Sequence, residues 1–171
     1  MEILLAYASV EGLTRRVAAR IAEIARETGH LVHLVDIADE SLSLAEGTGA
    51  VILAAPVHAG AYPKRFESLV RDWADQLTYT RNALVSVEPA PGRGTDRNAA
   101  EGFVAQLSAA TGWVPGHQHH VAEAPGAADL GLVRRALGRF GLGGAADAAD
   151  PTDWAALERF TRGFLAEIAT S

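Results

Sequence analysis

The 171-residue chain contains no cysteine, and this absence excludes several kinds of chemistry at once. Disulfide bonds, thiolate nucleophiles, cysteine-bound iron–sulfur clusters and thiol-based zinc sites all require that side chain. Any oxidation–reduction activity of this protein must therefore come from a bound cofactor. The sequence also lacks an internal repeat and a low-complexity tract.

Long apolar runs and excess positive charge are absent as well. No stretch approaches the roughly 20 apolar residues that are needed to span a bilayer. The opening segment, MEILLAYASVEGLT, has no basic n-region and no small-residue cleavage site, so we expect no secretory signal and a cytoplasmic location. The formal net charge of −6 argues against duplex nucleic acid as the main partner.

The chain does contain enough apolar sequence for one substantial core. Hydrophobic residues make up 49% of it and charged residues 21%, which is typical of a globular protein. A length of 171 residues fits one domain comfortably, and we expect residues 1–171 to form a single domain.

Short apolar stretches alternate along the chain with segments of helical periodicity. The stretch Ala50–Ala55 (AVILAA) is apolar on both of its faces, which favours a parallel sheet covered by helices on two sides. Five stretches predict strands: Glu2–Ala8, Leu31–Ile37, Ala50–Ala55, Asn82–Val87 and His117–Ala122. Their alternation with helices predicts right-handed crossovers in one open α/β sheet, where ligands bind at the carboxyl ends of the strands.

Five segments predict the helices between and after these strands. The first begins at Leu13 and should end at a capping Gly29, and the second begins near Pro63. The third and fourth carry apolar residues over Phe103–Leu107 and Leu130–Phe140. The last should begin with Asp150 as the N-cap and Pro151 in the first turn.

The turn from the first strand into the first helix has the composition of a phosphate-binding loop. Amide groups at a helix N-terminus are unsatisfied, and the helix dipole favours an anion there. Hydroxyl groups of Ser9 and Thr14 add donors, and Gly12 allows close approach, so the loop needs no Lys or Arg. The predicted loop comprises Ser9, Val10, Glu11, Gly12, Leu13 and Thr14. The alternative is that Ser9 only caps the helix and Gly12 only turns the chain.

Other phosphate sites of α/β proteins do not fit this sequence. It has neither the G-x-G-x-x-G pattern of dinucleotide sites nor the G-x-x-x-x-G-K-[ST] pattern of nucleoside triphosphate sites. A receiver domain shares the architecture but needs a phosphoacceptor aspartate after the third strand, where this chain has Pro56.

The strand, the Ser9–Thr14 loop and the helix resemble the flavodoxin phosphate loop, whose pattern is Thr/Ser-x-Thr/Asp-Gly-x-Thr. Within the flavodoxin-like proteins, the chain is most similar to the menaquinone-dependent protoporphyrinogen dehydrogenases. The similarity extends through Ala55–Leu77, Asn82–Val87 and Asp150–Ile168, and Thr152-Asp153-Trp154 resembles a Thr-Asp-Trp typical of that family. It is weakest over residues 88–149.

The resemblance implies a flavodoxin-like α/β fold, a five-stranded parallel sheet with helices on both faces, and non-covalent FMN. The phosphate loop would hold the terminal phosphate, the loop after the third strand would pack against the flavin, and the loop after the fourth would contact its pyrimidine edge. Beyond the phosphate loop, the implied cofactor-binding residues are Pro56, Val57, His58, Ala59, Gly60, Tyr62, Ser86, Val87 and Glu88. The resemblance assigns no catalytic residue.

Two of these residues leave alternatives open. His58 either donates a hydrogen bond near the flavin or is a solvated loop side chain. Tyr62 either offers an aromatic face to the ring or packs at the start of the second helix. Gly60 supplies the backbone freedom that a contact between a peptide group and the flavin requires.

The resemblance implies an FMN-dependent oxidoreductase that oxidises protoporphyrinogen and passes electrons to a respiratory quinone in haem biosynthesis, peripherally at the inner face of the membrane. The segment over 120–144 departs from that family because it has no Tyr and is rich in Ala and Gly, whereas a hydrophobic tetrapyrrole requires aromatic surface. Its Arg134 and Arg135 would contact a membrane or an anionic substrate, or lie on an ordinary amphipathic helix. The alternative functions are a carrier flavodoxin between protein partners and a flavin-free binding module.

The segment His117-Gln118-His119-His120 is the one candidate for a metal site. His117 and His119 would share one face of a strand, but no Asp, Glu or Cys lies at a convincing ligand spacing. We therefore expect exposed strand histidines and no bound metal.

Overall fold

The computed structural model describes residues 1–10, 12–38, 42–45, 47–88, 97–122 and 152–170. Its five strands form one parallel sheet in the order β2-β1-β3-β4-β5. They are β1 (Glu2–Tyr7), β2 (Leu31–Asp36), β3 (Ala50–Pro56), β4 (Arg81–Glu88) and β5 (His117–Ala122). The five predicted strands are thereby confirmed, and their boundaries differ by no more than one residue.

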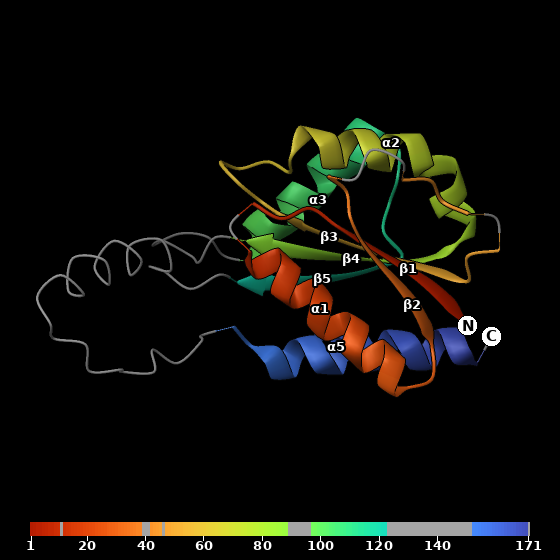
Figure 1. The fold of residues 1–171 in the computed structure, drawn as a ribbon. Coiled ribbons are helices and arrows are strands. Elements are labelled where there is room, and N and C mark those ends of the chain that lie inside the picture. The colour runs from red at the N-terminus through yellow and green to blue at the C-terminus, as the bar shows by residue number, and fades with distance from the viewer. Residues whose placement is uncertain (11, 39–41, 46, 89–96, 123–151, 171) are drawn as a thin grey trace, which may run out of the picture.

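Helices cover both faces of this sheet, as the apolar β3 predicted. In the described part of the chain they are α1 (Leu13–Glu27), α2 (Lys64–Tyr79), α3 (Arg97–Thr111) and α5 (Trp154–Ala169). Helices α1 and α5 lie on one face, and α2 and α3 lie on the other (Figure 1). The helix predicted over Leu130–Phe140 lies outside the described residues.

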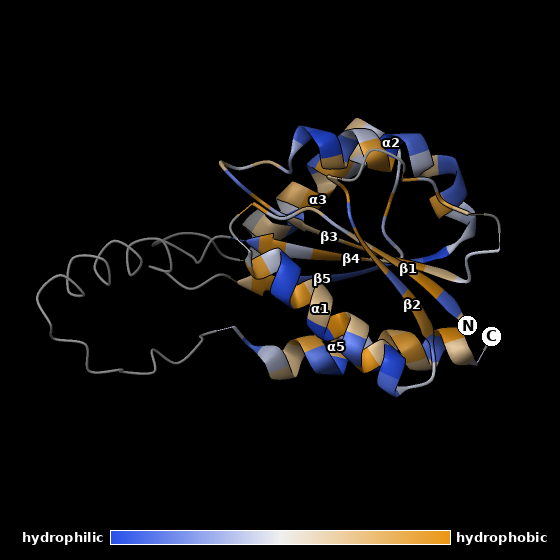
Figure 2. Ribbon diagram, in the orientation of Figure 1, coloured by the Kyte–Doolittle hydropathy of each residue, from blue (hydrophilic) through white to orange (hydrophobic). Residues whose placement is uncertain are grey.

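The sheet separates two apolar cores. Because side chains alternate along a strand, Ile52 of β3 packs toward α1 and α5 while its neighbour Leu53 packs toward α2 and α3. Both are nearly fully buried, as are Phe66 and Trp113 in the second core. Hydrophobic residues are concentrated along the central strands and on the inner sides of the helices, whereas the edge strand β5 is largely hydrophilic (Figure 2). No helix in the described part of the chain combines the length and the apolarity needed to cross a membrane.

Helix α1 ends as predicted, at a glycine cap. Gly29 has a φ of +85°, which a glycine adopts without steric cost. The amide of Gly29 donates to the carbonyl of Arg26, and the amide of His30 donates to that of Ala25 at 3.0 Å. These two bonds form a Schellman motif, which turns the chain into β2.

Helix α5 begins later than the sequence predicted. Its first residue is Trp154, and the carboxylate of Asp153 accepts a hydrogen bond from the amide of Ala156 at 2.8 Å. The prediction that Asp150 is the cap and Pro151 the first residue is therefore wrong. Asp153 lies at the centre of a tight turn, in which the Trp154 amide donates to the Thr152 carbonyl, so the helical conformation begins only after it.

One side chain ties several elements together at the edge of the sheet where the strands begin. The amide nitrogen of Asn82, at the start of β4, donates to the carbonyls of Leu77 and Thr80. Its oxygen accepts from the amide of Gly116, just before β5, at 2.8 Å. Asn82 is buried and thereby joins the end of α2, β4 and the approach to β5.

The strand order places a binding crevice at the opposite, carboxyl-terminal edge. The chain leaves β1 toward β2 on one side, whereas β3 lies on the other side of β1. In open α/β sheets ligands bind at the point where the strand order reverses in this way. The loops here start side by side: the amide of Ala8 donates to Ala54 at 2.9 Å, and that of Val57 donates to Val87 at 2.7 Å.

Candidate cofactor site

The end of α1 at this edge presents open backbone donors. Gly12 has a φ of +99° and immediately precedes the helix, whose first internal bond runs from the amide of Arg16 to the Gly12 carbonyl at 3.1 Å. The amides of Leu13, Thr14 and Arg15 therefore find no acceptor within the helix. No side chain of the described residues caps α1. The alternative in which Ser9 only caps the helix is thus wrong, whereas Gly12 does turn the chain.

The surroundings of these amides suit a phosphate group. A Cβ placed on Gly12 would meet no atom of the described residues within 4 Å, apart from its chain neighbours, so they leave space beside this backbone. The described first turn of α1 carries no acidic side chain, and Thr14 is buried beside the amides while Ser9 is half-buried. Val10 is exposed, and Glu11 lies outside the described residues. Hydroxyl and amide donors at the positive end of a helix dipole match the charge of a phosphate.

The loop after β3 begins with a tight turn. His58 and Ala61 exchange backbone hydrogen bonds of 2.9 and 3.2 Å, and the residues between them, Ala59 and Gly60, have φ values of +50° and +81°. Two consecutive positive φ values define a type I′ turn, which requires glycine or a strained residue at each position. The turn is exposed, so the side chain of His58 lies in solvent at the edge of the crevice.

Tyr62 lies beneath this turn. Its residue is 4% exposed, its ring centroid lies 5.6 Å from that of Phe66, and its hydroxyl donates to Ser86 Oγ at 2.8 Å. Packing at the start of α2 is therefore the arrangement that the structure shows, and the ring has no exposed face to offer a flavin. Ser86 and Val87 are buried as well, so they support the loops from below.

The pKa of Tyr62 is raised to about 12, mainly by burial; the hydrogen bond to Ser86 opposes this shift, and the nearby charge of Glu88 adds to it. Because its pKa is raised in the folded state, the contribution of Tyr62 to stability is fully present below pH 10, where tyrosine is protonated in the unfolded chain as well. This contribution is lost as the pH rises from 10 toward 12, because only the unfolded chain then releases the proton.

We therefore expect the free energy of unfolding to fall by roughly 2 to 3 kcal/mol more between pH 10 and pH 12 in the natural protein than in Tyr62→Phe. Urea titrations at several pH values measure this difference. Tyr79→Phe is the matched control, because Tyr79 is 92% exposed. The placement of Tyr62 would be contradicted if both variants showed the same pH dependence as the natural protein.

Glu88 forms a second polar contact at the end of β4. Its carboxylate lies 2.7 Å from Nδ1 of His120, and the two side chains are only 15% and 25% exposed. The other ring nitrogen of His120 is buried without a hydrogen-bond partner. The sequence predicted His120 as an exposed strand residue. Its contact with Glu88 depends on the register of β4 and β5, which places His120 opposite Ser86.

The other two strand histidines pack against α5. The ring of His119 stacks on Phe160 at 4.9 Å, and that of His117 meets Phe164 edge-on at 5.3 Å. Burial is the main reason that the pKa of His119 is lowered, and the charges of His120 and Arg159 add to it while Asp153 opposes it. These histidines are thus half-buried, which corrects the expectation that they are exposed. The described residues contain no cluster of three possible metal ligands.

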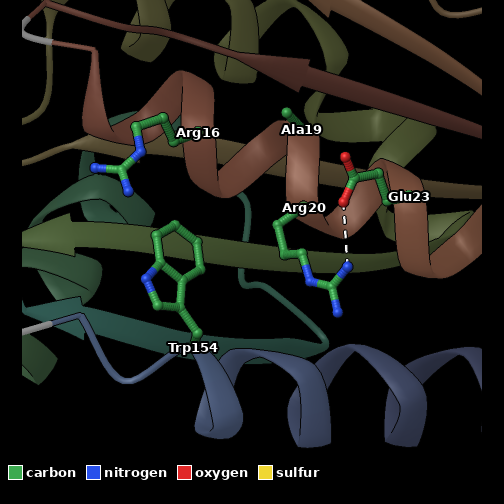
Figure 3. A pocket seen from close by; sticks show the side chains of 5 residues that line it. All are labelled: Arg16, Ala19, Arg20, Glu23 and Trp154. Atoms are coloured by element: carbon green, nitrogen blue, oxygen red, sulfur yellow. Dashed lines mark hydrogen bonds and ion pairs between the residues drawn. The ribbon is translucent and has the colours of Figure 1, made fainter. Parts of the chain in front are cut away.

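A groove of about 320 Å³ lies between α1 and α5, one turn from Gly12 (Figure 3). The guanidinium of Arg16 lies over the indole ring of Trp154, 5.3 Å from its centroid. Arg20 hydrogen-bonds to Glu23 at 3.1 Å and to Glu158 at 3.2 Å. The sequence predicted a phosphate loop without Lys or Arg. It does not indicate the contact of Arg16 with Trp154, because the two residues are far apart along the chain.

A doubly wound parallel sheet with an uncapped helix end at its switch point is the arrangement in which open α/β proteins bind nucleotides. Residues 4–137 match the flavodoxin domain family, and the chain belongs to this family. The family assignment supports FMN as the cofactor. A search of curated proteins finds no significant match.

Solved structures with the same fold include a flavodoxin, an oxidoreductase and a reductase. The flavodoxin of Streptococcus pneumoniae TIGR4 is 14% identical, with 99% of both chains covered and a TM-score of 0.56. Rubredoxin:oxygen oxidoreductase from the anaerobe Desulfovibrio gigas is 15% identical over 99% of this chain and 36% of that chain, with a TM-score of 0.58. A flavone reductase is 10% identical over 99% of this chain and 63% of that chain, with a TM-score of 0.57. These likenesses confirm the flavodoxin-like fold.

Proposed function

We propose that this protein binds FMN and carries electrons between protein partners, with residues 1–171 forming one flavodoxin-like domain. The observation that carries the proposal is the uncapped amide end of α1, which lies beside Gly12 at the switch point between β1 and β3. Membership of the flavodoxin domain family supports the same cofactor. The net charge of −6 suits docking onto basic partners.

Different residues around the crevice would hold different parts of the cofactor. The hydroxyls of Ser9 and Thr14 and the first amides of α1 would hold the phosphate. The exposed turn over 58–61 and the end of β4 at Val87 and Glu88 would frame the ring. Bound FMN supplies the electron-transfer chemistry, and the protein supplies binding, orientation and electrostatics. The negative charge of Glu88 would disfavour an anionic reduced ring.

A second candidate is oxidation of protoporphyrinogen with a respiratory quinone as acceptor, in haem biosynthesis at the inner face of the membrane. The observation that favours it is Thr152-Asp153-Trp154, which resembles the motif of those dehydrogenases. In the structure Thr152 is buried, Asp153 caps α5, and Trp154 lines the groove beside α1. Arg134 and Arg135, which were considered for substrate or membrane contact, lie outside the described residues.

Purification and two assays distinguish these candidates. We expect the protein to be yellow, to absorb near 450 nm, and to bind FMN stoichiometrically after the flavin is removed and added back. Reduction by a flavodoxin reductase without turnover of protoporphyrinogen would support the carrier. Turnover of protoporphyrinogen with menaquinone would select the dehydrogenase instead, and failure to bind FMN would refute both.

A further inference from the structure

We propose that His120, oriented by Glu88, takes up a proton from solvent when the bound FMN is reduced and releases it when the FMN is oxidised. The inference rests on the proposed function and adds to it a proton-exchanging side chain on β5. Three observations carry it: the contact between the two side chains, the nitrogen of His120 that has no partner among the described residues, and the position of the pair at the carboxyl-terminal edge of the sheet.

The contact with Glu88 fixes which nitrogen of His120 carries a hydrogen. Oε1 of Glu88 lies 2.7 Å from Nδ1 of His120, which is the length of a charge-assisted hydrogen bond. An ionised carboxylate only accepts hydrogen bonds, so Nδ1 must donate, and the hydrogen of the neutral ring lies on Nδ1. The other nitrogen, Nε2, then has a free electron pair and is the atom that accepts a proton.

Nε2 of His120 is available for this role. The atom is buried and has no hydrogen-bond partner in the described part of the chain. Protonation there converts a pair with one negative charge into an ion pair with no net charge, and the carboxylate of Glu88, only 15% exposed, stabilises the imidazolium. Histidine is also the side chain whose ordinary charge change falls between pH 5 and 8.

The pair lies where the ring of FMN would be framed. Glu88 is the last residue of β4, and the strand register places His120 opposite Ser86, so these three side chains share one face of the sheet. Ser86 also accepts the hydrogen bond of Tyr62, directly below the exposed turn of the crevice. Electrons added to the ring bring negative charge to this edge, which favours the protonated pair over the charged one. By linkage, the protonated pair favours reduction by the same factor.

The neighbouring titratable side chains keep one charge state near neutral pH. Tyr62 stays protonated, because its pKa is raised to about 12, mainly by burial. His119 lies on the other face of β5 and stays neutral, because its pKa is lowered mainly by burial; there Arg159 adds to the shift and Asp153 opposes it. On α3, the ionisable side chain that the structure describes is Glu101, which is exposed. Among these described groups, only the pair can follow the charge of the cofactor.

Nuclear magnetic resonance of the ring nitrogens tests the proposal in the natural protein. In flavin-free protein labelled with nitrogen-15 at histidine, the neutral ring of His120 should carry its hydrogen on Nδ1. With FMN bound, the ratio of protonated to neutral ring between pH 6 and 7 should be roughly tenfold higher in the fully reduced than in the oxidised protein. A hydrogen on Nε2 of the neutral ring, or the same ratio in both states, would overturn the proposal.

Redox titration of a variant measures the same coupling from the side of the cofactor. His120→Gln keeps a donor to Glu88 but cannot take up a proton. Its midpoint potential should match that of the natural protein at pH 9 and fall increasingly below it toward pH 5.5, by up to about 30 mV, because a tenfold coupling corresponds to that value for two electrons. The exposed His58 is present in both proteins, so its contribution cancels in this comparison.

His117→Gln is the matched control. It replaces a second histidine of β5 that also lies beside a carboxylate, at 3.3 Å from Glu167, but at the amino-terminal end of the strand. This variant should keep the natural pH profile of the potential, and FMN affinity and far-ultraviolet circular dichroism verify that both variants fold. A constant difference at every pH in His120→Gln, or the same profile in both variants, would overturn the role of His120 and leave the FMN site standing. Natural protein that binds no FMN would overturn the proposed function as well.

Discussion

Gly12→Asp is expected to weaken FMN binding by about a hundredfold to a thousandfold. The new carboxylate would project into space beside the first amides of α1 that no described residue occupies, apart from the chain neighbours of Gly12. It would repel the phosphate at close range, where two like charges interact with about 4 kcal/mol at an effective dielectric constant near 20. The φ of +99° adds backbone strain for any residue with a Cβ. Titration of the flavin-free variant measures the loss.

Gly29→Asp is the control for this prediction. Gly29 also has a positive φ and open space around a Cβ, but it lies at the other end of α1. The same strain and the same charge should there leave FMN affinity unchanged. A Gly12→Asp variant with the natural affinity would show that the phosphate does not lie at this turn.

Phe66→Ala is expected to lower the free energy of unfolding by about 3 to 5 kcal/mol, the range for removing a buried phenyl group. Phe66 is fully buried in the core between the sheet and α2, where it touches Tyr62. Its loss leaves a cavity directly below the turn over 58–61, so flavin affinity should fall together with stability. Urea denaturation and FMN titration measure the two effects.

Ser68→Ala provides the comparison on the same helix. Ser68 is exposed, and its replacement should change stability by less than about 0.5 kcal/mol. If Phe66→Ala were equally mild, the packing of α2 against the sheet would be different from that described above.

The sequence predicted the sheet well because its strongest signals are local. The apolar stretches that form β1, β3 and β4 are bounded by turns and periodic helices, and Gly29 has the conformation that its cap requires. The start of α5 was misplaced because Asp150 was predicted as its cap, and a second aspartate, Asp153, lies only three residues further along the chain. Only the hydrogen bond to Ala156 identifies the right one.

The site was predicted less completely because parts of it depend on contacts between distant segments. The open amides after Gly12 follow from a helix beginning in a glycine turn, which the sequence shows. The direction of Tyr62 depends on the type I′ turn before it, which places its ring in the core. The pair of Glu88 and His120 depends on strand register, and the contact of Arg16 with Trp154 depends on the packing of α1 against α5.

Asn82 fixes the sheet from the end remote from the cofactor crevice. Its one buried amide group holds α2, β4 and the approach to β5 in alignment without help from any loop of the crevice. The contacts of Asn82 that align the strands and the loops that would hold the cofactor therefore lie at opposite edges of the sheet. We therefore expect changes in the crevice loops to leave the geometry of this frame intact.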